Sequence, residues 1–168
     1  MALLITLGAA VAVYTLYNRY FVERPFKEEI SRLPGVQGVV LARDEHKVTV
    51  TVSMGDMEDF APTYRGIEQL AEQRFGKEGY SIKIKDRRNE ELQEFYGELQ
   101  LYLYEGIANN SFLWLDKEIG RLAGQRGLGY KVSVDEENLY LQLHDKRNYL
   151  YEVIRRKESG SINQGLGR

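Results

Sequence analysis

The sequence predicts an α+β protein in which an amino-terminal transmembrane helix precedes two small α/β sandwich units, ordered α-β-β-α-β and then α-α-β-β-α. Residues 2–17 carry neither a charge nor a proline, which indicates an apolar helix. Residues 47–52 and 80–85 alternate in polarity, which is typical of half-buried strands. Apolar residues at helical spacing occupy the stretches between the strands. The expected organisation is an anchor at 1–21, units at 22–88 and 89–158, and a flexible Gly- and Ser-rich tail at 159–168.

The composition excludes several classes of function. The chain has 168 residues, with 23 Lys and Arg against 25 Asp and Glu, and no cysteine. These totals exclude a disulfide framework, a thiolate metal site, a cysteine nucleophile and a strongly basic nucleic-acid surface. Every charged residue follows position 18, so the near-neutral balance belongs to the region beyond the apolar run.

The amino-terminal run is the most specific signal in the sequence. At about 1.5 Å per residue, a helix over residues 2–17 is roughly 25 Å long, close to the ~30 Å hydrocarbon core of a bilayer. Amphipathic aromatic residues and cations gather at its carboxyl end, as they do at a membrane interface. These residues are Tyr14, Tyr17, Arg19, Tyr20, Phe21 and Arg24. We predict a single-pass anchor in a lipid bilayer. A cleaved signal peptide and a buried core helix are the alternatives, but no Lys or Arg precedes the run as a signal peptide requires.

The charges beside the anchor indicate its orientation. Arg19, Arg24 and Lys27 lie on its carboxyl side, against Glu23. Positive residues favour the cytoplasmic side of a membrane, so the folded region is slightly favoured there. The bias rests on three residues, and the opposite orientation stays open.

The first unit is expected to contain five elements. Pro25 is suited to a helix start, and Pro34-Gly35 to a helix end. Acidic and polar residues between the first two strands indicate a hairpin turn. In order, the elements are a helix from Pro25 to Pro34, strands at 36–41 and 47–52, a helix at about 56–75 and a strand at 80–85.

The second unit is less regular. Residues 89–112 fit helical spacing, and part of this stretch also fits a strand, but its glutamates favour a helix. A second helix is expected through Trp114 and Ile119, and then a hairpin with an acidic turn at 135–137. Residues 146–157 place Tyr149, Leu150, Val153 and Ile154 on one side of a final helix.

Two stretches of the first unit correspond to stretches of the second. Residues 27–35 align with 116–124 at an offset of 89, and residues 44–52 align with 135–143 at an offset of 91. The first alignment matches Glu, Ile, Arg, Leu and Gly, and the second matches an acidic turn followed by a strand. This pattern predicts two α-β-β units and is consistent with an internal duplication. Chance identity between two similar α/β layers is the alternative.

The sequence offers no catalytic, cofactor-binding or metal-binding residues, and no enzyme activity is predicted. His46 and His144 have no second histidine at ligand spacing. Carboxylates at 44–45 and 135–137 suit a hard cation, but they suit tight hairpin turns better. Glycines at 120–129 end a helix before a strand, the reverse of a phosphate-binding loop.

Twelve tyrosines are the last unusual feature of the sequence. Amphipathic aromatic residues are enriched at protein interfaces, and many of these tyrosines lie in the second unit. The candidate interaction surface consists of Tyr96, Tyr102, Tyr104, Trp114 and Tyr140. Ordinary packing in a half-buried layer is the alternative explanation for them.

The stretch Ile30-Ser31-Arg32-Leu33-Pro34-Gly35-Val36, followed by a hairpin, a helix and a third strand, resembles the ring-building-motif domains of bacterial secretion and sporulation membrane complexes. The resemblance covers residues 25–85. Heavy-metal-associated domains share a similar turn, but their Cys-x-x-Cys is absent here. The resemblance implies a membrane-anchored module that packs beside copies or relatives, and it transfers no catalytic or binding residue.

These observations predict a single-pass, non-catalytic interaction or assembly module of a bacterial membrane complex, which binds a protein partner or forms a homo-oligomer and does not bind nucleic acid. A membrane-tethered domain that senses a small ligand is the alternative. A pocket lined by Tyr96, Tyr102 or Tyr140 would favour that alternative.

Overall fold

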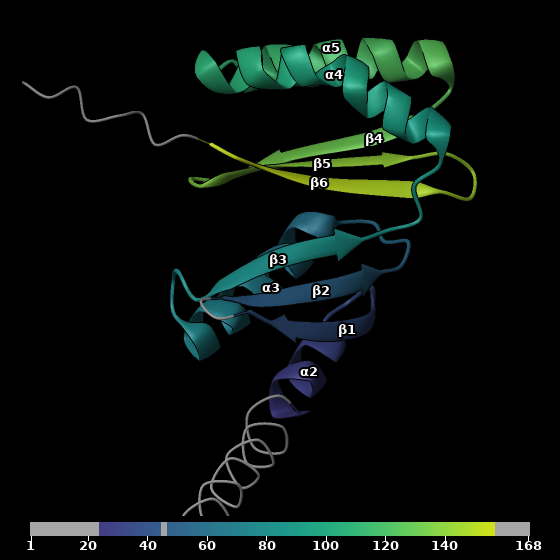
Figure 1. Ribbon diagram of the computed structural model, residues 1–168. Coiled ribbons are helices and arrows are strands. Elements are labelled where there is room, and N and C mark those ends of the chain that lie inside the picture. Colours follow the sequence, from purple (N-terminus) through teal and green to yellow (C-terminus); the bar gives the residue numbers. More distant parts are fainter. Residues whose placement is uncertain (1–23, 45–46, 157–168) are drawn as a thin grey trace, which may run out of the picture. The chain divides into compact units, whose positions relative to one another are not determined.

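The computed structural model describes residues 24–44 and 47–156, which form an α+β fold of four helices and two three-stranded sheets (Figure 1). The predicted anchor, the tail at 159–168 and five of the predicted interface residues lie outside these ranges. Those residues are Tyr14, Tyr17, Arg19, Tyr20 and Phe21. Within the described ranges, no helix has both the length and the apolar character needed to cross a bilayer.

The chain divides into two compact units. The first comprises Met1–Glu58 and Pro62–Lys85, and the second comprises Asp59–Ala61 and Asp86–Arg168. Each unit contains one of the two sheets.

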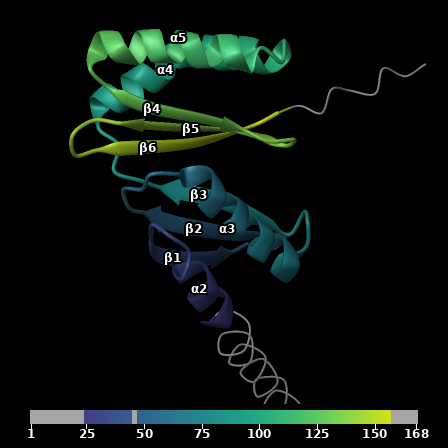
Figure 2. The same cartoon turned by 180° about the vertical axis from the view of Figure 1, so that it is seen from behind.

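In the first unit, helices cover one face of a sheet with the strand order β1-β2-β3 (Figure 2). Strand β1 pairs antiparallel with β2, and β2 pairs parallel with β3. The elements are α2 (Arg24–Ser31), β1 (Val36–Arg43), β2 (Val48–Met54), α3 (Phe60–Phe75) and β3 (Tyr80–Lys85). This order confirms the predicted α-β-β-α-β sequence of elements.

The core of the first unit lies between this sheet and its helices. Alternate residues of β2, from Val48 to Met54, are buried, as expected for a strand with one covered face. Phe26 of α2 meets Phe75 of α3 edge to face, with ring centroids 4.9 Å apart. The main buried apolar side chains are Phe26, Ile30, Val50, Val52, Met54, Ile67 and Ala71.

In the second unit, two helices lie over one face of the antiparallel sheet β4-β5-β6 (Figure 1). The elements are α4 (Glu90–Ala108), α5 (Phe112–Arg126), β4 (Gly129–Val134), β5 (Asn138–His144) and β6 (Tyr149–Arg155). The helix predicted for the ambiguous 89–112 stretch is confirmed. Asn89 caps α4 by accepting a hydrogen bond from the backbone N–H of Leu92.

Leucine dominates the core of the second unit. Alternate residues of β5 point toward the helices, and the buried residues of α4 and α5 recur at helical spacing. The cluster consists of Leu92, Phe95, Leu99, Leu103, Leu115, Ile119, Ala123, Leu128, Leu139, Leu141, Leu143 and Leu150.

The prediction of a final helix over residues 146–157 is wrong, because the chain forms strand β6 there. The Asp145 carboxylate accepts hydrogen bonds from the backbone N–H groups of Arg147 and Asn148, each at 2.7 Å, and reverses the chain within four residues. The aromatic and β-branched residues that follow favour an extended backbone. Leu150 therefore joins the core beside the helices, while Tyr149 falls on the other face of the sheet.

Candidate interaction surface

Four large apolar residues are exposed near the turn that joins α4 to α5. Leu101 and Tyr104 of α4 are 80% and 65% exposed, and Leu113 and Trp114 of α5 are 91% and 37% exposed. We call these four residues the hairpin patch. Single exposed leucines are ordinary, whereas exposed leucine and aromatic residues on one helical hairpin are typical of interaction surfaces, so the hairpin patch is the candidate surface.

Close packing holds the two helices of the hairpin together. A Cβ added at Gly106 of α4 would lie 2.8 Å from a methyl carbon of Leu115, so this glycine permits the close approach of α5. At the other end of the hairpin, Glu98 forms an ion pair with Arg126. The guanidinium of Arg126 also lies over the ring of Phe95. The patch therefore rests on a fixed scaffold.

The rings of Tyr102 and Trp114 stack across the groove between the helices. Their centroids are 6.1 Å apart, with 27° between the ring planes. Beside them, Arg121 forms an ion pair with Glu118 at 2.9 Å, which raises the pKa of the Arg121 guanidinium. The stack fixes the orientation of Trp114, whose remaining surface is open.

The surroundings of the patch are acidic. Helix α4 carries five glutamates and no Lys or Arg. At about 100° per residue, Glu94 and Glu105 lie within roughly 40° of Leu101 around the helix axis. Both glutamates are exposed. The outer face of α4 thus combines an aliphatic centre with negative charge on either side.

The structure brings some of the predicted surface residues together and not others. Tyr102, Tyr104 and Trp114 lie on the hairpin. Tyr96 packs partly against the core, and burial, followed by the charge of Glu152, raises the pKa of its hydroxyl. Tyr140 is only 3% exposed and projects from the face of β5 opposite the leucines of the core.

The aromatic residues proposed to line a ligand pocket therefore do not converge. Tyr96 and Tyr102 pack against the helix side of the sheet, and Tyr140 projects from the other side. The hydroxyl of Tyr140 instead donates to the Asp135 carboxylate at 2.7 Å. A ligand-sensing function for this unit stays a prediction.

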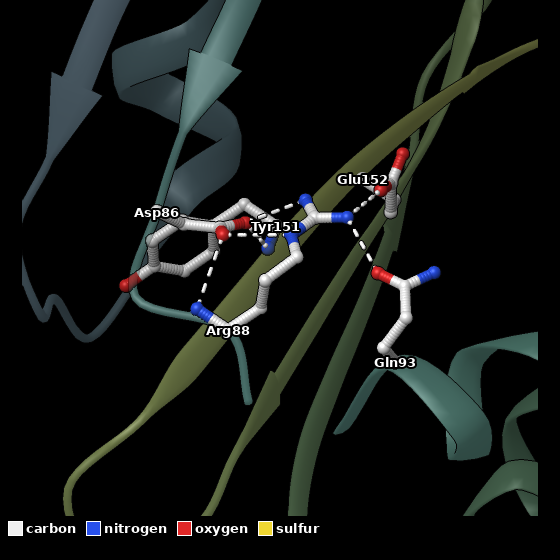
Figure 3. A network of polar contacts seen from close by, with 5 residues as sticks. All are labelled: Asp86, Arg88, Gln93, Tyr151 and Glu152. Atoms are coloured by element: carbon white, nitrogen blue, oxygen red, sulfur yellow. Dashed lines mark hydrogen bonds and ion pairs between the residues drawn. The ribbon is translucent and has the colours of Figure 1, made fainter. Parts of the chain in front are cut away.

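An ionic network at the start of the second unit fastens the chain to β6 (Figure 3). The Asp86 side chain is 2% exposed. Its carboxylate accepts two hydrogen bonds from the Arg88 guanidinium, at 2.7 and 2.8 Å, and one from the backbone N–H of Tyr151 at 2.9 Å. Arg88 also donates to Glu152 at 2.8 Å and to Gln93 at 3.1 Å.

These contacts raise the pKa of Arg88, mainly through its hydrogen bonds to Asp86. Every charge in the network has an opposite partner, which is the arrangement of a structural ion-pair cluster. Arg88 thus has a structural role, whereas Lys83 and Lys85 of the nearby strand β3 are exposed.

Among the carboxylates considered for a cation, that of Asp135 stabilises a turn. The Asp135 carboxylate accepts from the backbone N–H groups of Glu137 and Asn138, as Asp145 does in the next turn. Among residues 24–44 and 47–156, no three His, Asp or Glu side chains are grouped to hold a metal ion. His144 ends β5 with an exposed side chain, and His46 lies outside the described ranges.

Leu101 and Leu113 were missed as surface residues. The signal was present, because Leu101 lies outside the apolar stripe that a helix at 89–108 predicts. If residues 99–104 formed a strand instead, Leu101 would lie on the same face as Leu99 and Leu103, so its exposure was not predicted. The candidate surface residues were chosen for their aromatic character, which included Tyr140 and left out both leucines.

No family model matches the chain, and no curated protein or solved structure shows significant similarity to it.

Proposed function

We propose that this chain is a single-pass membrane-anchored interaction module, without catalytic activity, that binds a protein partner through the hairpin patch. The observation that carries the proposal is the exposure of four large apolar side chains on a rigid helical hairpin. The apolar run at 2–17 supplies the anchor in this proposal, with the folded units on the cytoplasmic side.

Physical arguments favour a protein partner for this surface. Tyrosine and tryptophan are among the side chains that contribute most when they enter a partner's pocket, and the two exposed leucines add apolar area that binding would bury. The aromatic stack and the close approach at Gly106 reduce the conformational entropy lost on binding. The carboxylates of Asp86, Asp135 and Asp145 are engaged in an ion pair or in turns, which supports a structural role for these three residues.

The test is the size of the complex released from the chain's own membranes by a mild detergent, measured on a native gel. Leu101→Asp combined with Leu113→Asp introduces charge at two exposed positions and leaves Trp114 as a fluorescent reporter of folding. We expect the wild-type chain to migrate above the size of one copy in its micelle and the double variant to migrate at that size.

Lys146→Asp, at an exposed turn of the same unit, is the matched control and should migrate like the wild type. The proposal is contradicted if the wild type already migrates as one copy, or if the double variant keeps both its fold and the larger size.

A further inference from the structure

We propose that the partner of the hairpin patch is a second copy of this chain, which docks through the open face of its β1-β2-β3 sheet. The inference rests on the proposed function, because it names the partner of the surface assigned there. It follows from a complementarity of polarity and charge between two surfaces of the same chain.

The open face of the first sheet is basic. Small side chains form its centre: Thr49, Thr51 and Ser53 of β2 alternate with the buried residues of that strand. On one side, Lys83 and Lys85 of β3 lie in register with Thr51 and Ser53. Both lysines are exposed, and neither forms an ion pair with a described residue.

An exposed apolar residue lies on the other side of the same row. Val40 of β1 pairs with Thr51 and is 61% exposed. One row across the three strands therefore reads Val40, Thr51, Lys83. This row has an aliphatic residue at one edge and a cation at the other. Small ligands usually bind in concave pockets, so an open sheet face of this kind is better suited to a helix of a protein partner.

The outer face of α4 carries the opposite features. Leu101 is its exposed aliphatic centre, and Glu94 and Glu105 lie on the same side of the helix. If α4 crosses the strands of a second copy's sheet, Leu101 lies toward Val40 and one of the two glutamates lies toward Lys83 and Lys85. Complementary charge of this kind determines which surfaces pair and in which orientation.

Charge also disfavours the other pairings. Two α4 faces would bring glutamates against glutamates, and two sheet faces would bring lysines against lysines. An anionic lipid surface would repel the five glutamates of α4. The remaining pairing is heterologous, so each copy uses one surface toward one neighbour and the other surface toward the next.

The absence of cysteine allows a direct test with the full chain purified in detergent micelles. One preparation carries Val40→Cys and another carries Leu101→Cys, and a short bismaleimide links thiols that meet. We expect the equimolar mixture to form at least about fivefold more cross-linked dimer than either preparation by itself, because only the mixture brings the two different surfaces together.

Charge reversal then identifies the interface. Lys83→Glu with Lys85→Glu in the Val40→Cys chain should reduce cross-linking about tenfold, and Glu94→Lys with Glu105→Lys in the Leu101→Cys chain should restore it. Lys77→Glu with Lys146→Glu, at exposed lysines elsewhere, is the matched control. Raising the salt from about 50 mM to about 500 mM should lower the yield severalfold.

The inference is overturned if the mixture yields no more dimer than the separate preparations, or if Leu101→Cys cross-links mainly with itself. It is also overturned if phosphatidylcholine–phosphatidylglycerol vesicles shield Leu101→Cys from a maleimide while no mixed dimer forms. In these cases, a native-gel shift that still depends on Leu101 and Leu113 would preserve the proposed function and assign it to a different protein partner.

Discussion

The two units begin alike and end differently. In the first, α2 leads into the β1-β2 hairpin, and in the second, α5 leads into the β4-β5 hairpin. The aligned residues Ile30 and Ile119 are both fully buried, as are the aligned Val50 and Leu141. The same helix-on-hairpin packing therefore forms around equivalent apolar positions in both units.

The third strand distinguishes the units. A 16-residue helix, α3, separates β2 from β3, and the two strands pair in parallel. A four-residue turn at Asp145 separates β5 from β6, which pair antiparallel. Parallel neighbours need a long crossover and antiparallel neighbours need only a turn, so the connection determines the topology of each sheet. The second unit also has α4 before its shared segment, and α4 bears half of the hairpin patch.

The largest effect is expected from the centre of the second core. Leu141→Ala removes a fully buried side chain from the middle strand and should lower the free energy of unfolding by about 3 kcal/mol. Urea denaturation monitored by Trp114, the single tryptophan, measures it. Leu101→Ala is the matched control on the surface of the same unit, and equal losses for both variants would contradict the core assignment.

A smaller loss is expected from the ionic network. Asp86→Ala removes the acceptor of Arg88 and of the Tyr151 N–H, leaving donors without their partner, and should cost about 2 kcal/mol. The same fluorescence measurement applies, with the exposed Glu136→Ala as the comparison. A loss of less than about 0.5 kcal/mol in the free energy of unfolding would show that the network contributes little to stability.

The turn that distinguishes the second unit is expected to be sensitive to acid. Hydrogen bonds from the backbone of Arg147, and then from Asn148 and Asn89, lower the pKa of Asp145 to about 2. The pKa of Asp145 in the unfolded chain is about 4. Because its pKa is lower in the folded unit, the ionised carboxylate stabilises the fold above about pH 4, and this stabilisation is lost as the pH falls toward 2.

Asp145→Asn keeps an acceptor in the turn and removes the titration. Unfolding of the variant, monitored by Trp114, should therefore depend less on pH between about 4 and 2 than that of the wild type. Asp145→Ala should also lose about 1 kcal/mol at neutral pH, because the turn loses its acceptor. Identical pH profiles for wild type and Asp145→Asn would exclude this role.

The smallest expected effects on stability come from two Gly→Ala variants at α5, and they have opposite signs. Gly127 ends α5 with φ of 65°, so Gly127→Ala should destabilise the second unit by about 1 kcal/mol. Gly124 lies inside the helix with open space around its Cα, so Gly124→Ala should stabilise the unit by about 0.5–1 kcal/mol. Thermal unfolding midpoints measure both, and a shift of the same sign in the two variants would contradict the assigned end of α5.

Local patterns predicted most of the elements because each carries its own periodicity. Pro25 and Pro34-Gly35 indicated the limits of α2, and alternating polarity indicated β2. The final strand was missed because Tyr149, Leu150, Val153 and Ile154 also fit a helical face, and only the hydrogen bonds of Asp145 select the turn. The contact between Asp86 and Tyr151 could not be predicted either, because the two residues lie far apart in the sequence and local patterns do not reveal it.

The candidate surface was predicted in part for a similar reason. Tyr104 of α4 and Trp114 of α5 belong to the hairpin patch, and the partly buried Tyr102 stacks on Trp114 beside it. Tyr140 does not, because strand alternation places it opposite the core leucines. Tyrosine fits a wet surface and a half-buried layer equally well, so residue type could not separate these environments.

In the proposed function, a protein covers the outer face of the α4–α5 hairpin in the membrane. The decisive measurement is the rate at which a membrane-impermeant maleimide labels Leu101→Cys in opened native membranes, relative to the purified chain diluted to one copy per detergent micelle. Lys146→Cys in an exposed turn is the reference position. We expect labelling of Leu101→Cys to slow at least about tenfold in the membrane while labelling of the reference is unchanged, because an apolar residue at the centre of an interface is shielded from solvent. Equal rates in both settings would contradict it.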